Sequence, residues 1–219
     1  MSIFHTPRID PSRDVRLLEV HKIGTDLLKC SFHVEQMYRL STTKYEALSY
    51  TWGANPRGIE ELNFIWIENN RFCVRRNVFN FLLAWAPDSG ESAGDSKLVF
   101  IDAVCINQQD DHEKCHQVLC MRDVFGKAES VVIWLWEPGN TPMTWHAIFC
   151  ADDQNDRRAP GELANVSDLF NCRYWSRVWI VQEVLLAKRL LLLTVGKGSC
   201  KMLDLDAFIR STFTLRLQM

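Results

Sequence analysis

Glu183 occupies a position where a surface carboxylate would be out of place. It lies in the run 178–187, in which only Gln182 and Glu183 are polar. A helix that is apolar all round is buried, and a buried carboxylate needs hydrogen-bond donors, a shifted pKa or a polar cavity. Glu183 is therefore our candidate for a catalytic carboxylate. The alternative, equally open from the residue alone, is a structural carboxylate that pairs with Arg173 or Arg177.

A second set of polar side chains follows an apolar run at residues 98–103. Asp102 ends that run, and Asn107 and Gln108 lie in the loop before the next predicted helix. Ligands of open α/β sheets bind outside the carboxyl ends of the strands, so these groups are candidates to hold a ribose or an amide. The alternative is that Asp102 and Asn107 tie the loop together through bonds to the backbone.

Two aromatic residues follow a different predicted strand. Tyr50 and Trp52 come at the end of the segment 45–50, just before Gly53. They could form another wall of the same site by stacking on a base. The alternative is aromatic core packing beside a turn glycine.

Other chemistries are less well supported by the sequence. His112, His116 and Cys120 recur at every fourth position, as zinc ligands on one helix face would. However, His112 and Cys120 would be about 12 Å apart along the axis, too far for one tetrahedral ion to take all three. A nucleophilic pair of Cys105 and His112 lacks an orienting third group, and no glycine-rich phosphate loop is present. We expect no metal site.

Apolar runs and turn residues divide the chain into strands and helices. We expect strands at 15–20, 30–40, 45–50, 65–67, 72–74, 98–103, 131–136 and 190–195, and helices at 77–86, 110–128, 144–150 and 173–187. Asn69 and Asn70 would form a hairpin turn, Asn77 would cap one helix, and Asp110 or Asp111 would cap the next. Continuous apolar strands alternating with helices predict an α/β domain with a mainly parallel central sheet flanked by helices. Residues 98–103 and 131–136 would form a parallel pair across their helix.

Bulk properties exclude several classes of protein. The net charge of -2 over 219 residues gives no electrostatic case for nucleic acid. No apolar run is long enough to span a bilayer, so we expect no membrane partner. The N-terminus lacks the apolar region of a signal peptide, so we expect a cytoplasmic protein whose eight scattered cysteines are free thiols.

Three blocks of the sequence together resemble the fungal heterokaryon incompatibility (HET) domain. They are residues 45–53, residues 100–108 with Gln117, Val118, Met121 and the run 131–135, and residues 173–183. Their order and spacing match as well. The resemblance implies strands packing on the domain at 1–44, the HET domain at 45–200, and a tail at 201–219 that would begin a further, helical region.

The same resemblance implies a role in fungal non-self recognition that leads to programmed cell death, with an upstream recognition protein as partner. HET domains resemble TIR domains, which implies a flavodoxin-like sheet with an added N-terminal β-hairpin. Some TIR domains cleave NAD with a glutamate on a helix, and Trp179, Gln182 and Glu183 resemble that motif. NAD would then be a substrate, no cofactor would be required, and Glu183 would stabilise an oxocarbenium-like transition state. The rival hypothesis is a non-enzymatic signalling module that acts by homotypic assembly, as a homo-oligomer.

Overall fold

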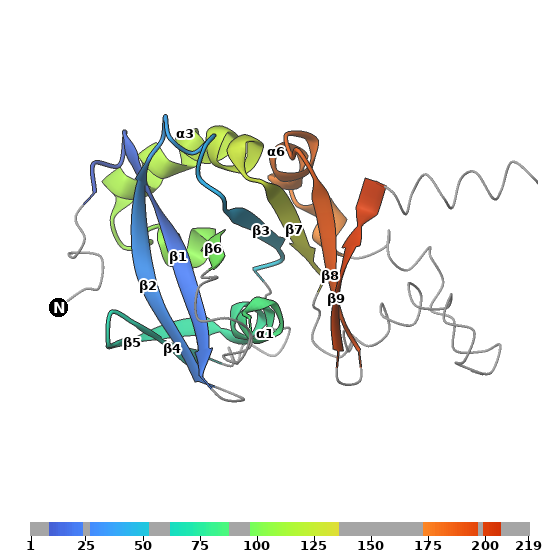
Figure 1. Ribbon diagram of the computed structural model, residues 1–219. Helices are drawn as coiled ribbons and strands as arrows, with labels where there is room; N and C mark the ends of the chain where they lie inside the picture. Colours follow the sequence, from blue (N-terminus) through green and yellow to red (C-terminus); the bar gives the residue numbers. More distant parts are fainter. Residues whose placement is uncertain are drawn as a thin grey trace, which may run out of the picture.

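The strands of the protein form one nine-stranded mixed sheet in the computed structural model, which describes residues 9–23, 27–52, 62–87, 97–135, 173–196 and 199–206. The strand order is β5-β4-β2-β1-β6-β3-β7-β8-β9 (Figure 1). The strands are β1 (Asp14–Ile23), β2 (Leu27–Gln36), β3 (Glu46–Tyr50), β4 (Leu62–Ile67), β5 (Asn70–Arg75), β6 (Lys97–Phe100), β7 (Ser130–Trp134), β8 (Leu190–Gly196) and β9 (Ser199–Asp204).

The sheet is α/β and flanked by helices as predicted, but the expectation that it is mainly parallel is wrong. Pairing is parallel between β3 and β6, β3 and β7, β7 and β8, and β2 and β4. It is antiparallel between β1 and β2, β1 and β6, β4 and β5, and β8 and β9. The physical reason is local. Three pairs of consecutive strands are separated by only two or three residues, and so short a connection can join only antiparallel neighbours.

A block of four parallel strands forms the centre of this sheet. It consists of β6, β3, β7 and β8, and counting from β3 along the chain its order is 2-1-3-4. Flavodoxin-like sheets begin with this order. They bind ligands beside the carboxyl end of the first strand, at the point where the strand order reverses direction. The strands in segments 98–103 and 131–136 therefore run parallel, as predicted. They do not pair with each other, because β3 lies between them. The implied relation to TIR domains remains a hypothesis.

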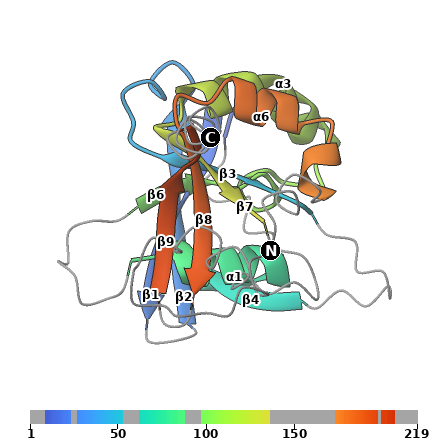
Figure 2. The same cartoon turned by 90° about the vertical axis from the view of Figure 1, so that its right-hand side faces the viewer.

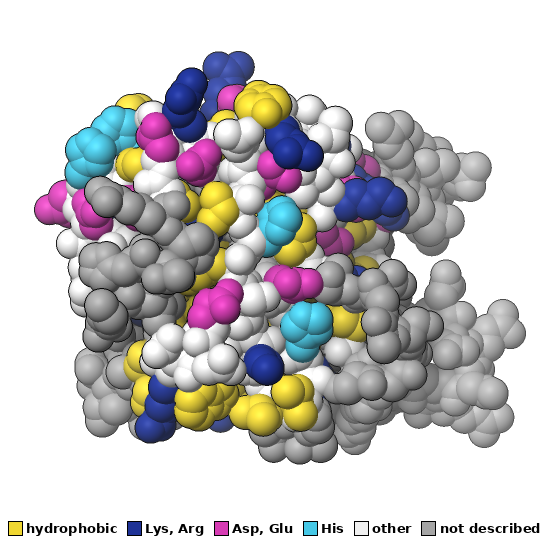
Figure 3. Space-filling model, turned by 60° about the vertical axis from the view of Figure 1, so that its left-hand side comes forward, with side chains coloured by type: hydrophobic (Ala, Val, Ile, Leu, Met, Phe, Trp, Pro, Cys, Tyr) yellow, Lys and Arg dark blue, Asp and Glu magenta, His cyan; other side chains and the backbone are white. Residues whose placement is uncertain are grey.

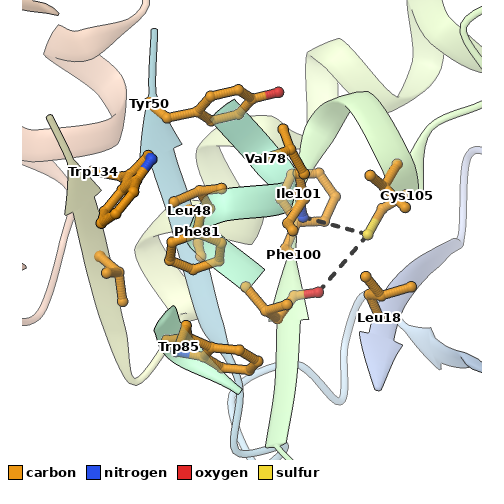
Figure 4. Packing of buried hydrophobic residues seen from close by; sticks show 14 of the residues in the cluster. Leu18, Leu48, Tyr50, Val78, Phe81, Trp85, Phe100, Ile101, Cys105 and Trp134 are labelled. Atoms are coloured by element: carbon orange, nitrogen blue, oxygen red, sulfur yellow. Dashed lines mark hydrogen bonds between the residues drawn. The ribbon is translucent and has the colours of Figure 1, made fainter. Parts of the chain in front are cut away.

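Helices cover both faces of the central block. Helices α3 (Asp111–Lys127) and α6 (Ile180–Leu185) lie on one face and α1 (Arg76–Trp85) lies on the other, as the two ribbon views agree (Figures 1 and 2). On the α1 face, the Phe81 ring stacks on Trp85 with centroids 5.8 Å apart and meets Trp134 edge-on at 6.0 Å (Figure 4). The central strands are thus buried on both sides, which explains their continuous apolar sequences. No helix in the described part of the chain is long and apolar enough to cross a membrane.

Two predicted helix caps had different outcomes. The carboxylate of Asp110 accepts from the backbone N–H of His112 and Glu113, so the cap of α3 is confirmed. Asn77 is not a cap, because α1 begins one residue earlier and Asn77 is buried inside it. Its amide donates to the Thr51 carbonyl at 2.6 Å and accepts from the Trp134 indole N–H at 2.6 Å. Asn77 therefore ties the ends of β3 and β7 to α1.

Other segments differ from the predictions by small shifts. The β4–β5 turn is formed by Glu68 and Asn69, which have positive φ of 49° and 63°, so it lies one residue earlier than expected. Residues 199–204 form β9, a hairpin partner of β8, so the predicted helical tail does not begin at residue 201; helical residues begin at Leu205. The predicted helix at 144–150, residue Gly53 and the chain beyond residue 206 lie outside the described residues.

A buried ion pair fixes the N-terminal hairpin to the rest of the fold. The Arg16 guanidinium of β1 donates to both carboxylate oxygens of Glu113 on α3, at 2.5 and 3.2 Å, and both side chains are buried. The same carboxylate accepts from the backbone N–H of Asn107 at 2.7 Å. Removing one partner of such a pair leaves a buried charge uncompensated, so the pair holds β1, α3 and the intervening loop in one arrangement.

Replacing Asn77 with alanine tests the polar link between β3, β7 and α1. We expect the free energy of unfolding to fall by about 2–3 kcal/mol, because the Trp134 N–H and the Thr51 carbonyl both lose their partner. Chemical denaturation measures the change. Asn80→Ala, in the same helix, is the control and should stay within about 0.5 kcal/mol of wild type. Equal effects of the two substitutions would contradict the link.

Candidate functional site

Glu183 is buried, and both oxygens of its carboxylate accept hydrogen bonds. Its side chain on α6 is about 3% exposed, and its two oxygens accept a bidentate pair from Arg177, at 2.9 and 3.0 Å. The hydroxyl of Ser49, near the end of β3, donates to the same carboxylate and contacts the Tyr174 hydroxyl at 2.6 Å. The pairing with Arg177 that the structural alternative predicted is therefore present.

The segment that carries Glu183 is not the continuous buried helix that was predicted. Residues Arg173–Ser176 form the 3-10 helix η2, a turn follows, and α6 begins only at Ile180. This break places Arg177 beside a glutamate six residues further along. Much of the apolar run faces solvent: Val178, Val181 and Leu185 are 84%, 57% and 76% exposed. Glu183 is buried because α6 packs on α3 and on the end of β3, and not because the helix is surrounded.

Asp102 lies near this network, at the start of the short helix α2 (Asp102–Cys105) and not at the end of a strand. Its carboxylate accepts from the Trp52 indole N–H at 2.9 Å, from the Ala103 backbone N–H at 2.7 Å and from the Tyr50 hydroxyl. Burial raises the pKa of Asp102 above its usual value, and the nearby charge of Glu183 raises it further, although the hydrogen bonds oppose this. Asp102 and Glu183 thus lie close enough for the charge of one to affect the other, and Tyr50 and Ser49 at the end of β3 connect them to that strand.

Tyr50 and Trp52 differ in exposure. Tyr50 is buried, and burial raises its pKa well above the usual range. Figure 4 shows it beyond Leu48 at the end of β3. Trp52 is 37% exposed, with the Arg75 guanidinium 5.6 Å from the centre of its ring. Arg75 also donates to the Trp52 carbonyl at 2.5 Å. Only Trp52 of the two presents an aromatic surface to solvent beside the carboxylates.

The amides of Asn107 and Gln108 are used within their own loop. The Asn107 side chain accepts from the Gln109 N–H at 3.2 Å, and Gln108 donates to the Asp102 carbonyl at 2.9 Å. These are the loop-tying bonds that the alternative for this segment predicted. The Gln108 amide thereby holds the backbone of Asp102 in place. Asn107 lies nearer to the Arg16–Glu113 pair, since its backbone N–H donates to Glu113.

Trp179 and Gln182 are both exposed, Trp179 to 47%, although Glu183 next to them is buried. The structure therefore brings Glu183, Asp102, Tyr50 and Trp52 to one edge of the sheet and leaves Trp179 and Gln182 on the outer side of α6. We call the first four of these residues and the polar side chains around them the polar cluster. Four of its members were not assigned to a site from the sequence. They are Ser49, Arg75, Asn77 and Tyr174. A polar residue inside an apolar strand was the available signal for Ser49.

The His112–His116 pair does not extend to a metal centre. The ring centroids are 4.4 Å apart, and His116 Nδ1 lies 2.9 Å from the His112 carbonyl oxygen. Within the described ranges no three His, Cys, Asp or Glu side chains are grouped so as to hold an ion. Cys105 is buried, and burial raises its thiol pKa to about 12, which argues against its use as a thiolate nucleophile at neutral pH.

The raised pKa of Asp102 predicts a pH dependence of stability. Below its unfolded pKa, near 3.8, Asp102 is protonated in both states and its contribution is fully present. As pH rises through the higher folded pKa, the folded state loses its proton at a cost, so this contribution is lost. We expect Asp102→Asn to remove this part of the fall in stability with rising pH. Thermal unfolding from pH 4 upwards measures the change. Asp111→Asn, at an exposed position of α3, should keep the wild-type slope; a matching change there would refute the assignment.

Comparison with known proteins supports the identity that the three sequence blocks suggested. The model of the family "Heterokaryon incompatibility protein (HET)" matches residues 45–183. The chain is 33% identical over 132 residues to "Heterokaryon incompatibility protein 6, OR allele" of Neurospora crassa, a match that covers 58% of this chain and 19% of that protein. The chain thus spans about a fifth of that relative. No solved structure matches it. The matched region runs from the start of β3 to Glu183 and contains the whole polar cluster, and the chain belongs to the heterokaryon incompatibility (HET) family.

Proposed function

We propose that this chain is a heterokaryon incompatibility module that acts in fungal non-self recognition and leads to programmed cell death. Membership of the family and the name of the Neurospora relative support this role. Within it, we propose that the module signals without catalysis and that Glu183 is a structural residue. The observation that carries this choice is that both oxygens of the Glu183 carboxylate pair with Arg177, and that one of them also accepts from Ser49.

The energetics of the ion pair favour the structural assignment. A carboxylate removed from water is stable only if its partners replace the lost hydration, and a bidentate arginine is the strongest such partner. A substrate that took the place of Arg177 or Ser49 at Glu183 would remove part of that compensation. In a signalling module no such exchange is needed.

Assembly with further copies is the means of signalling that we propose for this module. Val178, Val181 and Leu185 expose large apolar surfaces on one short stretch of α6 and the turn before it. Contiguous exposed apolar residues are typical of interaction sites. Self-association of the purified chain, lost on Val181→Lys, would support this, and a strictly monomeric chain would count against it.

NAD cleavage is the second candidate, and one observation favours it. Glu183 and Asp102 both lie beside the carboxyl end of β3, the strand that pairs with β6 on one side and β7 on the other. This is the point at which flavodoxin-like sheets bind ligands. Trp52 offers an exposed ring beside them for stacking. In this case the carboxylate of Glu183 would stabilise positive charge on the ribose as the bond to nicotinamide breaks.

Glu183→Gln separates the two functions. If Glu183 is structural, the substitution leaves the Arg177 charge poorly compensated and lowers the free energy of unfolding by about 3 kcal/mol, with no NAD turnover by the wild type. If Glu183 is catalytic, the wild type releases nicotinamide, and this release falls by about 100-fold or more in the variant at temperatures where both proteins stay folded. Release is followed at several protein concentrations.

Two further variants sharpen this test. Glu129→Gln removes an exposed glutamate and should change neither stability nor turnover. The double variant Arg177→Met with Glu183→Leu replaces the whole pair by apolar side chains and should recover most of the stability lost in Glu183→Gln, because neither partner is left alone. Failure to recover, together with wild-type turnover of NAD, would reject the structural assignment.

A further inference from the structure

Strand β5 forms one edge of the nine-stranded sheet. Among the described strands it pairs only with β4, through six residues from Asn70 to Arg75. An edge strand presents a row of backbone N–H and C=O groups that can pair with another extended chain. Natural edge strands commonly carry charged side chains, and the charges of β5 decide which chain it can accept.

The outward face of β5 is basic. Successive side chains of a strand alternate between faces, so Arg71, Cys73 and Arg75 share one face. Arg71 is exposed, and its guanidinium lies 3.5 Å over the ring of Phe64 on β4. Stacking uses the flat face of a guanidinium and leaves its N–H edges directed outwards, so Arg71 is held in place for a carboxylate. Figure 3 shows hydrophobic and basic side chains together in the lower part of this side of the molecule, where Figure 1 places β4 and β5.

The opposite face of β5 is apolar. Val74 is 5% exposed, and α1 contacts both β4 and β5. A strand added beside β5 would direct every second side chain towards this apolar layer and the others towards the arginines. The added strand must therefore alternate apolar and acidic residues.

A second copy of β5 does not meet this requirement. Antiparallel pairing of two β5 strands brings the Arg71 and Arg75 of both copies to the same face, and like charges opposite one another destabilise a pair of strands. We propose that the edge of β5 is a docking site for an extended, acidic segment of a partner protein, which adds an antiparallel strand to the sheet. A carboxylate of this segment lies opposite Arg71, and its apolar side chains lie beside Val74.

Binding of a short peptide that alternates valine and glutamate tests this proposal, with isothermal titration calorimetry on the whole chain. We expect binding that weakens with salt, and no binding of the matched valine–lysine peptide. Arg71→Glu should weaken binding of the acidic peptide by about tenfold and create binding of the lysine peptide. Arg122→Glu, on the exposed side of α3, is the control and should leave both results unchanged.

Amide hydrogen exchange locates the peptide. The acidic peptide should slow exchange in residues 70–75 and not in β8 or β9. Failure of the acidic peptide to bind, equal binding of both peptides, or equal effects of Arg71→Glu and Arg122→Glu would overturn the proposal. So would a dimer of the chain cross-linked through Cys73, which is exposed at the middle of β5 and would show that a second copy occupies the edge.

Discussion

The ion pair between Arg177 and Glu183 is the interaction on which the polar end of the sheet depends. It allows α6 to lie against the carboxyl end of β3 with an acidic group inside the contact, because the guanidinium replaces the water that burial removes. The Ser49 hydroxyl completes the compensation and connects the pair to the central strand. The Tyr174 hydroxyl contacts the same Ser49, so the 3-10 helix before α6 is connected to this strand as well.

A second buried pair, further along the same face of the sheet, also compensates an acidic group that burial removes from water. Arg16 and Glu113 connect the N-terminal hairpin to α3, and the Glu113 carboxylate also receives the backbone N–H of Asn107. In both places an arginine from one element meets a glutamate from a helix on the same face of the sheet. Each pair specifies one arrangement of its elements, since any sliding of the helix would leave a charge alone in an apolar layer.

The sequence predicted most elements and the convergence of the main candidate residues, but not how the carboxylates are used. Apolar runs located every strand up to β8, and Asp110 marked the start of α3 because its capping chemistry is local. The mixed sheet escaped prediction because strand partners are chosen by tertiary packing. Asn77 was misassigned because a buried asparagine and a capping asparagine have the same local sequence. Glu183 was recognised as buried for a wrong reason, since the apolar residues around it proved largely exposed.

The pairing of β1 with β6 has a consequence for how the chain folds. Leu18 of β1 lies opposite Val99 of β6, so these two strands can pair only after β2 to β5 and helix α1 have been synthesised. Contacts so distant in sequence carry a large loop-closure cost before they contribute stability, which slows folding. Until β6 arrives, the inner edge of β1 remains open and able to pair with other chains. The complete sheet is therefore expected to form slowly, and the partly folded chain is expected to be prone to aggregation in that interval.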